Sequence, residues 1–530
     1  MPTVLTKLQT FARTEFVANS GVVGLLFDLA LRSDNYFAKV LVVGALDLLL
    51  DQGYHMPSAL VQELKSSISD AGAFDLSFII RALQTGGPAA EDEKRHVLVL
   101  CSCLAVARSS NQDLLHRAGI LPFLVDLIKQ PTSALAAHAV LALGSLTCGN
   151  TATAAQAAQA GVLTPLVVLV GGGLPAARAW SAYAIGNLAC TSACRRALES
   201  RNAAKALLAL LMSGSGLQQQ WAAYALATLV TGGGVERGLH HLNDAVSVLA
   251  SMAQSGSSGQ KIWAAYALGA MADCVRAQFK SVQLVVAALD VLLGSDIELQ
   301  QLWAAYAVRK LAHDSPSTRS VLTSAGIVSR LAAIVARNEH STRLEATRAL
   351  TELATDSPPN CDAIIATNIM PVIVVMTTAN STGDEKLHIV SMLSRVVANA
   401  NATNRAKVAT PAAIAALVVI IQSPSAAETI QAEASCALGS LAQAGEHTRA
   451  AIEATNVVPA LQLLEQRASS WSPLAKWTAY ALKQLKPSRR GSRLLWSRSK
   501  QQSSGGLGGV GDDSPGSRRQ LQQLQQHLSG

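Results

Sequence analysis

The most regular feature of the sequence is an apolar, Ala-rich helical segment that recurs about every 42 residues. Five copies share the pattern Trp-x-Ala-Tyr-Ala followed by an aliphatic residue, and they begin at Trp180, Trp221, Trp263, Trp303 and Trp477. Segments with the same apolar spacing but without this aromatic pair begin at His96, His138, Glu345, His388 and Glu433. A fixed period of this length is the signature of a repeat protein in which each unit is one supersecondary structure.

A second apolar motif precedes these helices and begins with a small residue followed by Gly or Asn. It reads AGILPFLVDLI from Ala118, AGVLTPLVVLV from Ala160 and TNIMPVI from Thr367. Gly and Asn tolerate the left-handed conformation that ends a helix, and Pro is favoured in the first turn of the next one. The following apolar residues lie at i, i+3/4 and i+7, which gives one buried stripe. The motif therefore predicts a short helix, a sharp break and a second, apolar helix.

Together the two motifs predict an all-α chain of three-helix repeats. The period near 42, the Gly break before the second helix and the sequence AIGNL at 184–188 resemble the armadillo repeat family. The resemblance implies a right-handed armadillo-type superhelix (an ARM solenoid) of about eleven repeats over residues 1–486, with degenerate first repeats at 16–108. It also implies a long concave groove lined by the third helix of each repeat.

The Trp and Tyr side chains are the candidate partner-binding residues of that groove. On a helical wheel with Trp221 at 0°, Tyr224 falls at 300°, while the apolar Ala222, Leu226 and Leu229 cluster on another side. The predicted groove residues are Trp180, Tyr183, Asn187, Trp221, Tyr224, Trp263, Tyr266, Trp303, Tyr306, Trp477 and Tyr480. Two interpretations stay open: the rings pack between successive third helices, or they are platforms that hold an extended partner.

The resemblance extends to importin-α, which binds basic peptides through Trp and Asn ladders, and to the yeast vacuolar armadillo protein. Asn187 matches the Asn position, but later units have Lys310, Glu352 and Arg395 there, and Lys310, Arg309 and Arg395 make that part of the groove basic. We therefore expect a non-enzymatic scaffold or adaptor that binds an extended segment of another protein. A nuclear transport carrier and a regulatory subunit of a kinase or ubiquitin ligase complex are the alternatives.

Composition and charge narrow the class of protein further. The chain has 530 residues, is 50% hydrophobic and carries a formal charge of +8, of which residues 486–530 supply +6. The body therefore has no strong basic character, and we expect no nucleic-acid partner. No catalytic motif, cofactor motif or metal-ligand spacing occurs, so no enzyme activity, cofactor or metal is expected. The eight cysteines are expected to be reduced, and the absence of a signal peptide or a long apolar run favours the cytoplasm or nucleus.

The last part of the chain has a different composition. Residues 487–530 are rich in Ser, Gly, Gln and Arg, which predicts a disordered basic tail. Ser492 follows Arg489-Arg490-Gly491 and resembles a kinase phosphorylation site. The basic cluster would suit an acidic partner or an anionic surface, and Leu494, Leu495 and Trp496 are the apolar residues within it.

Overall fold

The computed structural model describes residues 109–231, 242–276, 279–337, 340–378, 383–469 and 471–486, with isolated positions between 80 and 105. Within these residues the chain is helical and has no β-strand, which confirms the all-α prediction. The degenerate repeats predicted at 16–108 fall almost wholly outside the described residues, and so do the tail 487–530 and Ser492. The described helices belong to two compact units that divide after Leu311.

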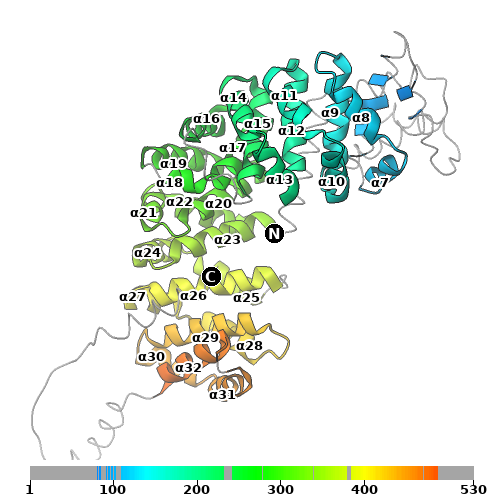
Figure 1. Ribbon diagram of the computed structural model, residues 1–530. Coiled ribbons are helices and arrows are strands. Elements are labelled where there is room, and N and C mark those ends of the chain that lie inside the picture. The colour runs from blue at the N-terminus through cyan, green and yellow to red at the C-terminus, as the bar shows by residue number, and fades with distance from the viewer. Residues whose placement is uncertain are drawn as a thin grey trace, which may run out of the picture. The chain divides into compact units, whose positions relative to one another are not determined.

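The helices of the N-terminal unit follow one another in the predicted order of short, apolar and Ala-rich helix (Figure 1). The first helices are α7 (Ser109–Arg117), α10 (Thr151–Gln159), α13 (Ser192–Glu199) and α18 (Ala272–Arg276). The second helices are α8 (Leu121–Ile128), α11 (Leu163–Gly172), α14 (Ala203–Ser213), α16 (Leu242–Ser255) and α19 (Phe279–Leu293). The third helices are α9 (Ala134–Thr147), α12 (Pro175–Leu188), α15 (Gly216–Val230), α17 (Ser258–Ala270) and α20 (Glu298–Ala312).

The C-terminal unit has the same order of helices. Its first helices are α21 (Pro316–Ser324), α24 (Pro358–Ala366), α27 (Ala402–Val408) and α30 (Glu446–Glu453). Its second helices are α22 (Ile327–Arg337), α25 (Met370–Thr378), α28 (Pro411–Gln422) and α31 (Val458–Arg467). Its third helices are α23 (His340–Ala354), α26 (Gly383–Asn399), α29 (Glu428–Ala442) and α32 (Pro473–Leu485).

The break between first and second helix has the predicted geometry. Gly161 has φ +85° and the axes of α10 and α11 differ by 84°, while Asn368 has φ +57° and α24 and α25 differ by 87°. Gly119, Asn202, Gly326 and Asn456 also have positive φ at the equivalent position. None of the described helices is by itself both long and apolar enough to cross a bilayer; four bent first-and-second-helix pairs meet the criteria of length and composition only when counted together.

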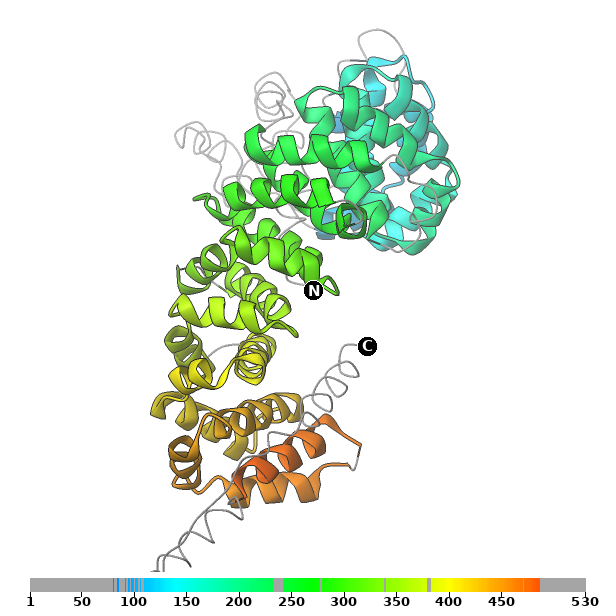
Figure 2. The same cartoon turned by 90° about the vertical axis from the view of Figure 1, so that its left-hand side faces the viewer.

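The third helices pack side by side, and those that pack on the second helix of their own repeat are α9, α12, α15, α17, α23, α26, α29 and α32. In the N-terminal unit α9, α12, α15 and α17 form one row (Figure 1), and in the C-terminal unit α26, α29 and α32 form another, drawn yellow to orange in Figures 1 and 2. Because the third helices of successive repeats are neighbours, equivalent positions of the repeat lie next to one another along each row.

In α12 and α15, a side chain two residues before the Trp position links the third helix to its own second helix. The Nε of Arg178 donates to the carbonyl oxygen of Val170 at 3.1 Å, and Nε2 of Gln219 donates to that of Leu211 at 3.1 Å. These carbonyls lie near the C-terminal ends of α11 and α14, where a helix leaves carbonyl groups without a partner within the helix. In these two repeats the polar side chain therefore caps the second helix from the third helix.

Candidate functional site

The predicted aromatic residues of the N-terminal unit form one continuous ladder of ring contacts. The ring of Trp221 lies 4.8 Å from that of Tyr183 and 6.2 Å from that of Trp180, measured between centroids. The next steps repeat this contact. Tyr224 lies 4.6 Å from Trp263, and Tyr266 lies 4.9 Å from Trp303. We call these residues the aromatic ladder: Trp180, Tyr183, Trp221, Tyr224, Trp263, Tyr266, Trp303 and Tyr306.

Each tyrosine of the ladder except Tyr266 lies over a glycine of the preceding third helix. A Cβ atom placed on Gly186 would lie 2.4 Å from the ring of Tyr224, and one placed on Gly269 would lie 2.7 Å from the ring of Tyr306. Gly144 under Tyr183 and Gly439 under Tyr480 repeat the arrangement. The glycine comes six residues after the Trp position of its own helix.

The pairing of glycine and tyrosine could have been found in the sequence. Tyr266 follows a helix that has Ala227 at the glycine position. Where a third helix lacks the tyrosine, the preceding third helix lacks the glycine too. Ser391 replaces the tyrosine on α26, and the preceding helix α23 has Thr351 at the glycine position. Cys436 replaces the tyrosine on α29, and the preceding helix α26 has Ser394 at the glycine position. A small residue on one third helix therefore occurs together with a tyrosine on the next. A helical wheel of one helix cannot show this correlation, because the two residues belong to neighbouring repeats.

These contacts bury the ladder. Trp221 and Trp263 are 0% exposed, and no ring of the ladder exceeds 7%. Three of the tyrosines, Tyr183, Tyr224 and Tyr266, are also covered by the Trp of the next third helix. Tyr480 lies on the last described third helix, has no such Trp after it and is partly exposed, whereas its neighbour Trp477 is buried. The structure thus favours the packing interpretation of these rings over open platforms, and their part in partner binding stays a prediction.

The side chain of Asn187 forms its hydrogen bonds within the same row of third helices. Its Oδ1 accepts a hydrogen bond of 2.6 Å from the hydroxyl of Tyr224, and its Nδ2 donates to the carbonyl oxygen of Gly144 at 2.8 Å. The side chain is buried and joins α9, α12 and α15. Of the residues predicted for the groove, this is the one that resembles the importin-α Asn, and in this structure its amide serves the packing of three consecutive third helices.

The Tyr224 hydroxyl gives a pH dependence that can be measured. Burial raises the pKa of Tyr224 well above its ordinary value near 10. Above that pH the unfolded chain releases the phenolic proton and the folded chain keeps it, so the free energy of unfolding falls as pH rises, by up to about 1.4 kcal/mol per unit. Burial raises the pKa of Tyr266 and Tyr480 as well, which adds to the same trend.

Tyr224→Phe is the variant that tests this assignment. At pH 8 it should be less stable than the parent by about 1–2 kcal/mol, because the Oδ1 of Asn187 loses its donor. Above pH 10 its stability should fall less steeply, because one tyrosine no longer titrates. Urea denaturation at pH 8, 10 and 11 measures both effects, and parallel pH profiles for the two proteins would show that this hydroxyl is not held as described.

In the C-terminal unit, charged side chains occupy the ladder positions between α23 and α26. Glu345 and His388 stand at the Trp position and Arg348 at the Tyr position. Nη2 of Arg348 lies 2.9 Å from Oδ2 of Asp384 and 2.9 Å from Nε2 of His388. Beside them, Arg343 forms an ion pair of 2.8 Å with Glu385, whose side chain is 3% exposed. Neighbouring third helices are therefore held together by ion pairs here and by rings in the N-terminal unit.

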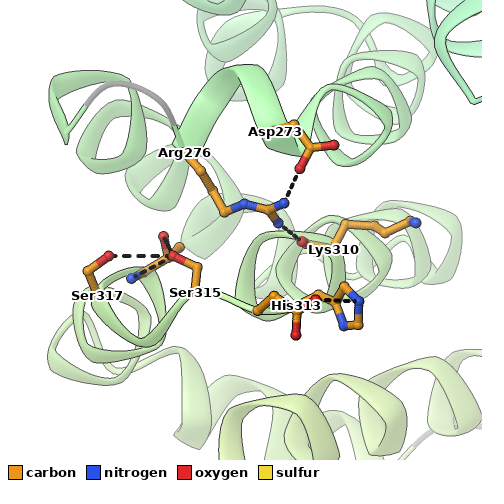
Figure 3. A network of polar contacts seen from close by, with 8 residues as sticks. Asp273, Arg276, Lys310, His313, Ser315 and Ser317 are labelled. Carbon is orange, nitrogen blue, oxygen red and sulfur yellow. Dashed lines mark hydrogen bonds and ion pairs between the residues drawn. The ribbon is translucent and has the colours of Figure 1, made fainter. Parts of the chain in front are cut away.

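The basic residues predicted for the groove have contacts within their own units. The guanidinium of Arg309 lies over the ring of Tyr306 at 5.3 Å, and Nη1 of Arg395 donates to the hydroxyl of Thr355 at 2.6 Å. Lys310 accepts a hydrogen bond of 2.6 Å at its main-chain oxygen from Nη1 of Arg276, which also forms an ion pair with Asp273 (Figure 3). The α18 helix is thereby attached to the C-terminal end of α20.

Five of the seven cysteines that the structure describes are buried. No cluster of three or more His, Cys, Asp or Glu side chains that could hold a metal ion occurs in the described residues. Burial raises the pKa of the Cys436 and Cys361 thiols to about 12, so both are protonated at neutral pH.

The described chain is thus an all-helical protein with repeat-like packing of neighbouring helices. It is similar to the crystal structure of an engineered protein, with a TM-score of 0.64 and 22% sequence identity, over 78% of this chain and 98% of that one. At this identity the likeness shows the fold alone. No family model and no curated protein matches the sequence.

Proposed function

We propose that the chain is an armadillo-type solenoid, a right-handed superhelix of about eleven repeats that includes the segment 16–108. Three features support this finer assignment. The described helices recur in groups of short, apolar and Ala-rich helix, the break between the first two is left-handed at Gly or Asn in six repeats, and at three of these breaks the helix axes bend by 76° to 87°.

We further propose that the protein is a non-enzymatic scaffold that holds an extended segment of another protein along the face of its third helices. The observation that carries this proposal is the side-by-side row of third helices, in which each sequence position recurs at every repeat. An extended peptide also repeats its backbone at regular intervals, so one set of contacts can be used again at each step. In the C-terminal unit, Glu352, Arg395 and Tyr480 are partly exposed on this row.

No described contact favours the importin-like alternative, since the amide of Asn187 is occupied within the protein. A regulatory role in an enzyme complex would use the same face, with the catalytic part on another chain. The scaffold proposal and these two alternatives therefore predict different bound segments. A crosslinking experiment can identify the segment.

The test places a photo-crosslinking residue, benzoylphenylalanine, at Glu352, Arg395 or Tyr480 of the full chain in its native cell. Neighbouring helices lie about 8–10 Å apart, and an extended chain advances about 3.3 Å per residue. Crosslinks from Glu352 and Arg395, which are one repeat apart, should therefore reach partner residues about three positions apart. Those from Tyr480 should lie about six positions further along the same segment.

The matched control carries the same crosslinker at Ala333, an exposed position on the second helix α22. It should give no crosslink to that segment. A synthetic peptide of the identified segment should then bind the purified protein. Crosslinks scattered over the surface of a folded partner, or equal yields from Ala333, would contradict the proposal.

A further inference from the structure

The second helices α25 and α28 have an outer surface without charge. Neither helix contains an Asp, Glu, Lys or Arg residue. They pack together through the buried side chains of Val374, Ala413 and Ala416. On the same two helices, Val375 and Val419 are 67% and 60% exposed. Leu463 on the neighbouring helix α31 is 53% exposed, and we call these three residues the outer apolar patch.

The residues of the outer apolar patch occupy one position of the repeat. Each lies two residues after the fully buried residue of its second helix, which is Ile373, Leu417 or Leu461. The equivalent residue of α22 is the exposed Ala333, so the repeat packs without a large apolar side chain at this position. Large exposed apolar side chains therefore occupy this position on three consecutive second helices, and apolar patches on a protein surface commonly mark interaction sites.

We propose that the outer apolar patch binds the segment Leu494-Leu495-Trp496 of the same chain. This segment lies outside the described residues and follows Lys486, the last described position, by eight residues. Eight extended residues span about 26–29 Å. Neighbouring second helices are about 8–10 Å apart, so α28 lies one such interval beyond α31 and α25 lies two. The tether that leads from α32 to these apolar residues is therefore longer than the two intervals that separate α31 from α25.

The segment is flanked by basic residues, and the helices at the end of the patch carry acidic as well as basic side chains. Basic residues flank the segment on both sides at Arg490, Arg493 and Arg498. Exposed acidic residues lie on the helices at the end of the patch, Glu453 on α30 and Glu465 on α31. The patch itself is uncharged, so burying leucine and tryptophan there desolvates no ion. Because the segment is covalently attached, its effective concentration at the patch is in the millimolar range.

The experiment uses the purified full chain with benzoylphenylalanine in place of Trp496. We expect crosslinks at α25, α28 or α31 in the monomer band, with a yield that does not change when the protein is diluted tenfold. The double variant Val375→Asp, Val419→Asp should reduce this yield at least tenfold, while Ala333→Asp on α22 should leave it unchanged. Far-UV circular dichroism should be the same for both variants, because all three substituted residues are exposed.

Three outcomes would overturn the proposal. Crosslinks confined to a dimer band and lost on dilution would assign the patch to a second copy of the chain. Crosslinks elsewhere in the monomer, or none, would show that the segment does not occupy the patch. Equal losses in the Ala333→Asp variant would show that added charge, and not the patch, determines the yield.

Discussion

Replacement of Trp221 by Ala is expected to lower the free energy of unfolding of the N-terminal unit by about 3–5 kcal/mol, the range for removal of a large buried aromatic side chain. Trp221 is 0% exposed and contacts the rings of Trp180, Tyr183, Tyr224 and Trp263. Its removal leaves a cavity between three consecutive third helices. Because each repeat is stabilised by its neighbours, the loss weakens the interfaces on both sides of α15.

Trp471→Ala is the matched control for this prediction. Trp471 lies in the turn before α32 and is 87% exposed, so its replacement should change stability by less than about 0.5 kcal/mol. Urea denaturation followed by circular dichroism measures both variants. If Trp221→Ala were as stable as Trp471→Ala, the ladder would not be part of the protein core, and the open-platform interpretation would regain support.

Gly186→Ala is expected to destabilise the same unit, although alanine is the better helix former. The added Cβ would lie 2.4 Å and 2.6 Å from two ring carbons of Tyr224. Overpacking a tight interface costs about 1–3 kcal/mol, whereas the gain in helix propensity is at most about 1 kcal/mol. The ring cannot yield readily, because its hydroxyl is held by Asn187 and its other side is covered by Trp263.

Gly171→Ala on α11 is a control substitution that we expect to raise the free energy of unfolding. A Cβ at Gly171 meets nothing within 4 Å, so this substitution should stabilise the protein by up to about 1 kcal/mol. Combining Gly186→Ala with Tyr224→Ala should recover part of the loss from the glycine change, since the clash partner is gone, and a double-mutant cycle measures that coupling. Additive effects, or a stabilising Gly186→Ala, would show that the ring does not rest on this glycine.

The helix breaks could be predicted from the sequence because their physical cause is local. A left-handed residue at Gly161 or Asn368 and a proline in the next turn decide the geometry within a few residues. The environment of Tyr224 could not be predicted in this way. A helical wheel places its ring relative to α15 alone, whereas its burial depends on Gly186 before it and Trp263 after it.

Asn187 shows the same limit. Its match to a groove position is a match of spacing, and spacing does not reveal that a tyrosine hydroxyl and a main-chain carbonyl of two other helices are within hydrogen-bonding distance. The ion pairs of Arg348 with Asp384 and of Arg343 with Glu385 likewise join residues 36 and 42 positions apart. Contacts between repeats have to be sought by comparing neighbouring repeats position by position.

The pairing of tyrosine with glycine also governs the order in which repeats can follow one another. The repeat that ends in α12 carries both Tyr183 and Gly186, so a tandem duplicate of it would find a glycine ready for its own tyrosine. The repeat that ends in α20 carries Tyr306 but has Arg309 at the glycine position. Duplication of the repeat that ends in α12 or α17 would therefore give the added tyrosine a glycine to pack on, but a tyrosine-bearing repeat inserted after α20 would have no place for its ring.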